Sequence, residues 1–315
     1  MQYVNVFVNS VSFESSPYSV SLGVPQGSTL GPLLFIIFIN DICNIINNSK
    51  LLFADDLKLY ASVKSIDDCK GLQSDVDMIY VWSLRNKLFF NIQKCKVMSY
   101  TRSRSPIEFQ YKMDDVPLER VSEITDLGVV FSSTLDFSPH INLICSKAWR
   151  LFGFIKRQGR FFEDPSVFKV LFNAFVRAQL EYASPVWAPY TISSDEALEC
   201  IQKKFLRYLL HRVSGVNTFH APYDLVKVIF DCEDLSVRRD SQCVRHITKL
   251  LSDRIDDSLC LAKLNFYVPD LRLRVRNIFL KPDPGRTTRR LFSPLNRAVA
   301  LYNASLVGVP AIHSD

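Results

Sequence analysis

The sequence lacks any pattern of paired cysteines. Its eight cysteines stand singly between residues 43 and 260, and no Cys-x-x-Cys motif occurs. Disulfide frameworks are typical of small secreted domains rich in cysteine, and structural zinc sites need closely spaced ligand pairs. Cys232, Cys243 and His246 are three loosely spaced candidate zinc ligands, for which buried thiols are the alternative. We therefore expect reduced cysteines and an intracellular location, in the nucleus or the cytoplasm.

Long apolar runs are absent too. The most apolar stretch, residues 33–39, ends at Asn40 and Asp41, whereas a bilayer-spanning helix needs about 20 apolar residues. No internal repeat or low-complexity segment interrupts the chain. With 48% hydrophobic residues the sequence can still form an ordinary core. It predicts a folded protein without a membrane segment.

Positive charge is scarce in the first sixty residues, which contain only Lys50 and Lys58. Residues 1–60 carry a net charge of −2, whereas the whole chain of 315 residues carries +6, so the remainder carries +8. Residues 140–214 contain eleven Lys and Arg residues against six acidic ones. This distribution favours contact with a polyanion downstream, and a solvated helix face is the alternative.

Hydrophobic periodicity changes near residue 136. Before it, short β-rich segments alternate with helical stretches at 33–46 and 66–88, which predicts an α+β fold. From residue 138 the period is helical. Helices are expected over residues 141–154, 165–182, 195–212 and 222–264, followed by a Pro- and Arg-containing tail over 265–315 that ends in a short helix at 294–306. The helix at 33–46 is apolar nearly all round, which predicts that it is buried.

Two adjacent carboxylates stand between two apolar strands. Residues 51–60 indicate a strand, an acidic turn at Asp55 and Asp56, and a second strand. Carboxylates that cannot be buried need a cation or solvent. Nucleotidyl transfer uses two Mg²⁺ ions held by oxygen ligands, and an acidic turn on a hairpin supplies one side of such a site. A solvated loop is the alternative for this motif by itself.

A glycine-spaced turn precedes the acidic hairpin. Residues 23–35 indicate a loop that leads into an apolar helix, with Ser28 or Thr29 as its N-cap. Gly27 lets the backbone approach a ligand closely, and the amide of Gln26 can contact a base or sugar edge. A simple helix start is the alternative for this loop in isolation.

In this order, the two motifs resemble the nucleotide-positioning and catalytic-hairpin motifs of reverse transcriptases from non-LTR retrotransposons, in particular the jockey-like LINE group. Further similarity covers the family's N-x-x-K strand start, primer grip, thumb and C-terminal end. These segments correspond to residues 91–98, 127–140, 180–204 and 294–303.

The resemblance implies a role for each motif residue. Asp55 and Asp56 would be catalytic carboxylates that bind Mg²⁺ or Mn²⁺, and Lys94 would lie near the departing pyrophosphate. An exposed lysine at a strand start is the alternative for Lys94. The template and the incoming deoxynucleoside triphosphate would contact Gln26, Gly27 and Ser28. The phosphates of the RNA template and DNA primer would contact Lys203, Lys204 and Arg207.

The resemblance also implies three regions: a partial reverse transcriptase palm over residues 1–136, a helical thumb over 137–215, and a helical C-terminal region with a basic tail over 216–315. The expected palm is an incomplete antiparallel sheet with helices. The arginines between residues 272 and 290 have no assigned role.

The family carries another metal-binding aspartate and the fingers before the glycine motif. Residues 1–25 contain only Glu14 as an acid, without that context. We therefore expect an RNA-directed DNA polymerase by family whose two-metal site is incomplete in this chain and which is inactive. A non-catalytic nucleic-acid-binding fragment is the alternative, and an unstable relic is a third.

Overall fold

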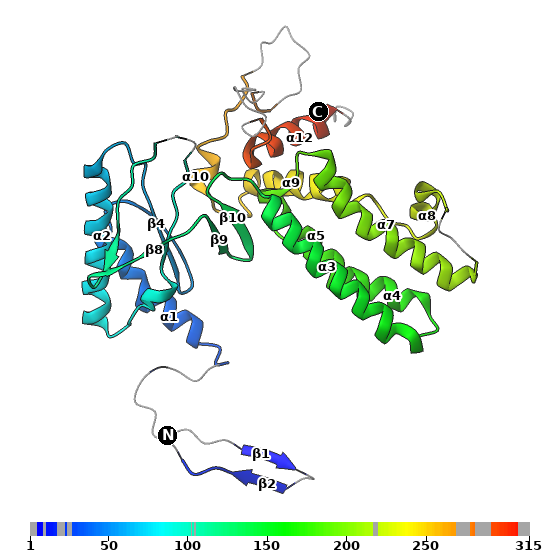
Figure 1. Ribbon diagram of the computed structural model, residues 1–315, viewed down its shortest axis with the longest axis horizontal. Helices are drawn as coiled ribbons and strands as arrows, with labels where there is room; N and C mark the ends of the chain where they lie inside the picture. The colour runs from blue at the N-terminus through cyan, green and yellow to red at the C-terminus, as the bar shows by residue number, and fades with distance from the viewer. Residues whose placement is uncertain are drawn as a thin grey trace, which may run out of the picture. The chain divides into compact units, whose positions relative to one another are not determined.

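The computed structural model describes residues 5–8, 11–17, 23, 27–101, 103, 105–216, 220–268, 278–280 and 291–307 (Figure 1). The chain divides into two compact units, Met1–Val121 and Ser122–Asp315. Helices and strands both occur, so the predicted mixed class is confirmed at that level. The finer division into palm, thumb and C-terminal region stays a prediction.

The first unit combines short antiparallel strand pairs with one long helix. Its elements are β1 (Asn5–Val8), β2 (Val11–Glu14), α1 (Gly31–Ile39), the 3-10 helix η1 (Asn40–Ile45), β3 (Ser49–Phe53), β4 (Asp56–Tyr60), α2 (Ile66–Asn86), the 3-10 turn η2 (Ile92–Lys94), β5 (Lys96–Val97), β6 (Lys112–Met113), β7 (Val116–Pro117) and β8 (Glu119–Arg120). Strands pair as β1–β2, β3–β4 and β6–β7, all antiparallel, and as β5–β8 in parallel. The predicted helix at 66–88 is confirmed.

Helix α2 contributes side chains to both apolar clusters of the first unit. A capping box fixes its start, because the Ser65 hydroxyl accepts from the Asp68 amide while the Asp68 carboxylate accepts from the Ser65 amide. One part of its apolar face, at Ile79 and Trp82, packs against the α1–η1 segment. Another part packs against the strands that follow. That second cluster contains Cys69, Val76, Tyr111, Met113 and Leu118.

Helix α1 contradicts the prediction that it is buried. Gly31 and Ile39 are its buried residues, whereas five large apolar side chains are 45% to 65% exposed. These are Leu33, Leu34, Ile36, Ile37 and Phe38. The apolar pattern extends all round the helix, yet within the described residues only one side finds a packing partner. The apolar pattern therefore predicted burial on all sides of α1, but in this chain only one side of the helix is buried.

The second unit is mostly helical. It begins with the hairpin β9 (Glu123–Asp126) and β10 (Val129–Ser132), which is antiparallel. Then follow α3 (Ser138–Gln158), η3 (Gly159–Phe161), α4 (Pro165–Leu171), the π-helix η4 (Phe172–Arg177), α5 (Ala178–Glu181), α6 (Ser184–Trp187), α7 (Ile192–Ser214), α8 (Tyr223–Ile229), α9 (Leu235–Leu251), α10 (Ser258–Leu261) and α12 (Pro294–Val307). The helices predicted at 141–154, 165–182 and 195–212 are confirmed.

Aromatic side chains form the core between α3, α4–α5 and α7, which lie side by side (Figure 1). Phe172 and Phe205 stack with ring centroids 3.9 Å apart and an interplanar angle of 8°. Phe152 meets Phe205 edge-on at 5.9 Å. A separate apolar cluster joins α9 to α12 and contains Ile247 and Val299. Because α9 also contacts α5 and α6, it links the two cores.

The segment from α5 to α6 holds the β9–β10 hairpin against the helices. The Tyr182 hydroxyl donates to the Leu127 carbonyl at 3.0 Å, and the Trp187 indole donates to the Tyr182 carbonyl at 2.7 Å. The Tyr182 ring lies 3.2 Å from where a Cβ of Gly128 would stand. Gly128 has a φ of 83°, so this close approach suits glycine alone.

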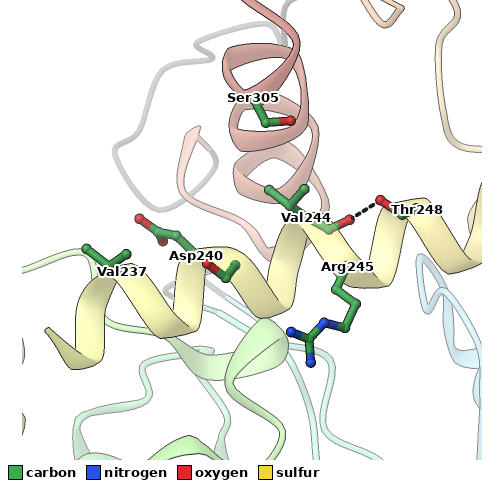
Figure 2. A pocket seen from close by; sticks show the side chains of 7 residues that line it. Val237, Asp240, Val244, Arg245, Thr248 and Ser305 are labelled. Atoms are coloured by element: carbon green, nitrogen blue, oxygen red, sulfur yellow. Dashed lines mark hydrogen bonds between the residues drawn. The ribbon is translucent and has the colours of Figure 1, made fainter. Parts of the chain in front are cut away.

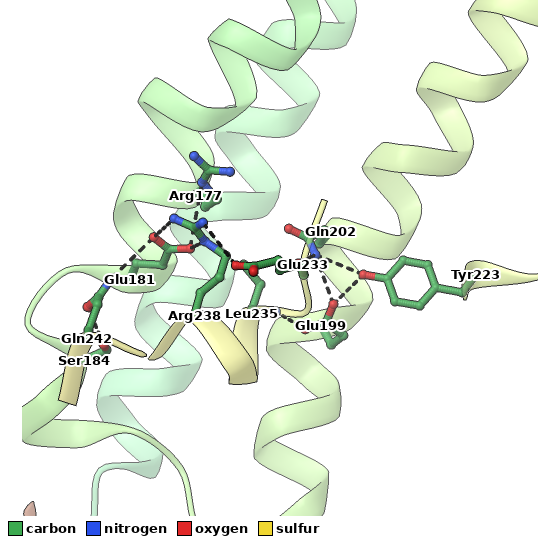
Figure 3. Close-up of polar contacts among 10 residues, drawn as sticks. All are labelled: Arg177, Glu181, Ser184, Glu199, Gln202, Tyr223, Glu233, Leu235, Arg238 and Gln242. Carbon is green, nitrogen blue, oxygen red and sulfur yellow. Dashed lines mark hydrogen bonds and ion pairs between the residues drawn. The ribbon is translucent and has the colours of Figure 1, made fainter. Parts of the chain in front are cut away.

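A partly buried ion pair joins α5 to α9 (Figure 3). The Glu181 carboxylate, 11% exposed, accepts from the Arg238 guanidinium through both of its oxygens. This bond raises the pKa of Arg238. Gln242 donates to the same carboxylate and accepts from the Ser184 hydroxyl. The arrangement fixes the angle at which α9 leaves the aromatic core.

Replacing Glu181 with Gln should lower the free energy of unfolding of the second unit by about 1.5 kcal/mol, because it leaves the partly buried guanidinium of Arg238 without its charged hydrogen-bond acceptor. Urea denaturation followed by tryptophan fluorescence measures the change. Glu163→Gln removes an exposed charge in the same unit and should change stability by less than about 0.5 kcal/mol. Equal stabilities for the two variants would contradict the role of the pair.

Candidate functional site

Asp55 and Asp56 lie at the closed end of the β3–β4 hairpin. Phe53 pairs with Asp56, so the two-residue loop consists of Ala54 and Asp55, and Asp56 is the first residue of β4. The predicted acidic turn is therefore shifted by one residue. Ala54 has a φ of 51°, a left-handed conformation that costs free energy in residues other than glycine. Both carboxylates are exposed to solvent.

The hairpin turns one face to the core and one away from it. Leu52 and Leu57 pair across the strands and pack in the core of the first unit. Because side chains alternate along a strand, Phe53 and Asp56 belong to the opposite face. Phe53 is 62% exposed there and Leu51 is 51% exposed. Asp56 therefore borders an open apolar surface.

Two adjacent carboxylates can supply one side of a metal site. Mg²⁺ takes about six oxygen ligands, and a two-metal site needs ligands on both sides of the reacting phosphate. In the part of the chain that the structure describes, no three His, Cys, Asp or Glu side chains lie close enough to hold a metal ion. The hairpin thus fits as one side of a site whose other ligands must come from water, substrate phosphates or further protein groups.

The glycine-spaced loop is described in part. Gln26 lies outside the described residues. Gly27 has a φ of 84°, which explains why glycine suits this position. The Ser28 hydroxyl accepts from the Gly31 amide at 3.1 Å, and it thereby satisfies a free N–H at the start of α1, although Leu30 is the N-cap residue.

Lys94 ends the turn η2, and its side chain is exposed. Its amide donates to the Asn91 carbonyl at 3.0 Å, which fixes the backbone that leads into β5. Among the described residues, no hydrogen bond or ion pair links Lys94 to Asp55 or Asp56. A functional meeting of the three side chains therefore stays a prediction.

Asp75 positions the hairpin, a role that sequence reasoning missed. This carboxylate is fully buried on α2 and accepts four hydrogen bonds. They come from the amide and side chain of Asn47, at 3.0 and 3.3 Å, and from those of Asn48, both at 2.8 Å. Asn48 immediately precedes β3. Burial raises the pKa of Asp75, but the hydrogen bonds from Asn47 and Asn48 outweigh burial, and the pKa is lowered overall.

Asp75→Asn should destabilise the first unit by about 3 kcal/mol at neutral pH, because an amide cannot accept four hydrogen bonds in place of a carboxylate. A lowered pKa in the folded state means that this stabilisation is present above the unfolded pKa, near pH 4, and disappears as the pH falls through the folded value. The difference between wild type and variant, measured by urea denaturation, should therefore shrink below about pH 4. A difference independent of pH would contradict a charged Asp75.

Helices α3 and α7 present a basic surface. α3 contains Lys147, Arg150, Lys156 and Arg157 and no acidic residue. In α7 the acids occupy the first half and the bases the second, as the helix dipole favours. The Lys156 ammonium lies 5.1 Å from the Tyr208 ring centroid. Cations and aromatic rings thus share the α3–α7 surface.

The three predicted phosphate contacts differ in environment. The Lys204 ammonium is exposed over the Trp149 ring on α3, 5.2 Å from its centroid. Lys203 is half-buried over the Tyr223 ring at 5.6 Å. Arg207 donates to the Ala221 carbonyl at 3.3 Å, and this bond makes its role at least partly structural.

A shallow hollow of about 500 Å³ lies between α9 and α12 (Figure 2). Its lining consists of Val237, Asp240, Ser241, Val244, Arg245, Thr248 and Ser305. Burial raises the pKa of Asp240. None of the predicted site residues lines this hollow. The arginines between residues 272 and 290, which have no assigned role, lie outside the described residues.

Among the described helices, none has the length and hydropathy to span a membrane.

A comparison with known protein families gives a match that includes the β3–β4 hairpin. The family model "Reverse transcriptase (RNA-dependent DNA polymerase)" matches residues 2–131. The chain is 31% identical over 146 residues to the probable RNA-directed DNA polymerase from transposon BS of Drosophila melanogaster, a match that covers 43% of this chain and 16% of the relative. It is 25% identical over 250 residues to the probable RNA-directed DNA polymerase from transposon X-element of the same species, covering 76% and 27%.

A third relative is the RNA-directed DNA polymerase from mobile element jockey of Drosophila funebris, 24% identical over 255 residues, covering 77% of this chain and 26% of the relative. No solved structure gives a significant match. The chain spans about a quarter or less of the length of these curated relatives.

These matches show that the chain is similar to reverse transcriptases, with the family model matching residues 2–131. Within that class, its relatives are RNA-directed DNA polymerases of jockey and X-element, and the resemblance to non-LTR retrotransposons is confirmed.

Proposed function

We propose that this chain provides the catalytic hairpin and the thumb of an RNA-directed DNA polymerase of a jockey-like retrotransposon. The observation that carries the proposal is the pair of exposed carboxylates, Asp55 and Asp56, at the closed end of the β3–β4 hairpin. Buried Asp75 holds the residues that precede this hairpin. The substrates would be an RNA template, a DNA primer and deoxynucleoside triphosphates. The regions 1–136, 137–215 and 216–315 would be palm, thumb and C-terminal region.

The residues of the first unit would divide the work of nucleotidyl transfer. Asp55 and Asp56 would hold Mg²⁺, which when bound supplies activation of the primer hydroxyl and neutralisation of phosphate charge. Lys94 would offset charge or donate a proton at the leaving pyrophosphate. Template and incoming nucleotide would contact Gln26, Gly27 and Ser28, where Gly27 keeps the backbone free of a side chain.

The basic surface of α3 and α7 would hold the template–primer duplex by its phosphates. Such contacts need positive charge but no reading of bases. Lys204 and Lys156 are exposed there, and Lys203 adds charge at the side of α7 that faces Tyr223. Arg207 would contribute charge while it also supports the segment at Ala221.

The 315-residue chain alone is expected to add no deoxynucleotide to primed RNA with Mg²⁺ or Mn²⁺, because Asp55 and Asp56 supply a partial ligand set. Primer extension with labelled nucleotide measures this. Fusing the upstream segment of a jockey relative before Met1 should restore extension. In that fusion, Asp55→Asn should abolish extension and Lys94→Ala should slow it on the order of a hundredfold.

Asp115→Asn is the matched control for this assay, since Asp115 is an exposed aspartate at another hairpin turn and should leave the rate of the fusion unchanged. Extension that survives Asp55→Asn would show that the hairpin has another role. A folded fusion without any activity would favour a non-catalytic nucleic-acid-binding protein.

The full chain should bind primer–template duplex with an affinity that falls steeply as salt rises. Replacing Lys203 and Lys204 with Gln should lower the affinity and reduce the slope of log K against log salt by about two, since each phosphate contact contributes about 0.9. Arg207 is kept, because its loss would remove a structural bond. Fluorescence anisotropy at several salt concentrations measures both quantities.

The matched control is the double variant Lys70→Gln with Lys87→Gln, which removes two exposed lysines of the first unit. It lowers the net charge by the same amount as the variant at Lys203 and Lys204. It should leave the salt slope unchanged. Equal slopes for the two double variants would place the phosphate contacts elsewhere.

A further inference from the structure

A turn at the end of α3 presents one aromatic ring to solvent. Phe161 closes the 3-10 turn η3 and is 87% exposed, more than any other aromatic side chain of the described residues. Single exposed apolar residues are common on protein surfaces, so exposure by itself indicates nothing. Two further features favour a binding role for this ring: the fixed backbone of the turn and the basic residues that precede it.

The backbone beside Phe161 is fixed by packing and hydrogen bonds. A Cβ at Gly159 would lie 2.3 Å from the Phe168 ring, so only glycine lets the turn pack there. The Phe162 amide donates to the Gly159 carbonyl at 3.1 Å, and Arg212 donates to the Phe162 carbonyl at 2.7 Å. The Phe162 ring packs edge-on against Phe168, with centroids 6.5 Å apart. One phenylalanine thus anchors the turn while its neighbour projects into solvent.

Basic residues precede the projecting ring in the sequence. Lys156 and Arg157 lie in the last turn of the acid-free helix α3, Arg160 lies in η3, and all three are exposed. Two acids follow the ring: Glu163 is exposed, and Asp164 caps α4 by accepting from the Ser166 amide. Exposed aromatic rings beside a positively charged surface are the combination that binds single-stranded nucleic acid, where rings stack on bases and cations contact phosphates.

We propose that Phe161 stacks on a base of single-stranded nucleic acid while Arg157 and Arg160 contact the adjoining phosphates. This inference rests on the proposed nucleic-acid binding by α3 and α7 and adds a contact of different chemistry. Phosphate contacts weaken with salt, whereas stacking involves no net charge and tolerates any base sequence. Because the turn is already rigid, little conformational entropy is lost when the ring binds.

Two labelled probes test the proposal on the full chain: a short single-stranded oligonucleotide and a blunt-ended duplex of the same sequence. Phe161→Ala should lower the affinity for the single strand by roughly fivefold to a hundredfold. The duplex affinity and both salt slopes should stay the same, because no charge is removed. Phe175→Ala, which removes another exposed phenylalanine of this unit, should change neither affinity.

A second variant, Phe161→Trp, should retain affinity for the single strand, and its additional indole fluorescence should be quenched when that strand binds. Unchanged single-strand affinity in Phe161→Ala, or no quenching in Phe161→Trp, would overturn the stacking contact while duplex binding still supports the proposed function. A chain that binds neither probe would overturn the proposed function and the stacking contact with it.

Discussion

The buried carboxylate of Asp75 is the constraint on which the candidate active site depends. A fully buried charge is tolerated only when hydrogen bonds compensate for its lost hydration, and four donors from Asn47 and Asn48 do so here. These donors stand at the start of β3, so the requirement of one charge fixes where the hairpin begins. The two-residue loop then determines where Asp55 and Asp56 lie.

The same helix fixes the second motif of the site. Trp82 of α2 donates from its indole to the Asp41 carboxylate at 3.1 Å, and Asp41 belongs to η1, which continues α1. Asp75 and Trp82 stand seven residues apart, two turns on one face of α2. The glycine-spaced loop leads into α1 and the acidic hairpin follows η1, so one face of α2 contacts the segment that joins the two motifs.

Local signals in the sequence predicted the helices at 66–88, 141–154 and 195–212, and the two motifs predicted the family. Interactions between distant residues could not be predicted in this way. The bonds from Asn47 and Asn48 to Asp75 span 28 and 27 residues, and nothing local distinguishes Asp75 from an exposed acid. The exposure of α1 was missed for the converse reason, since periodicity reports which side chains are apolar and not which partner covers them.

Counting charges underestimates how basic the outer surface of α3 and α7 is. Two acids of this region pair with arginines of α9: Glu181 with Arg238, and Asp195 with Arg239, which is 2% exposed. Glu199 accepts from Tyr223 and from the Leu235 amide at the start of α9 (Figure 3). Because Arg238 and Arg239 offset the charges of Glu181 and Asp195, these two carboxylates do not compete for the lysines of α3 and α7. The helix that completes the fold of the second unit therefore also adds to the positive charge balance of this region.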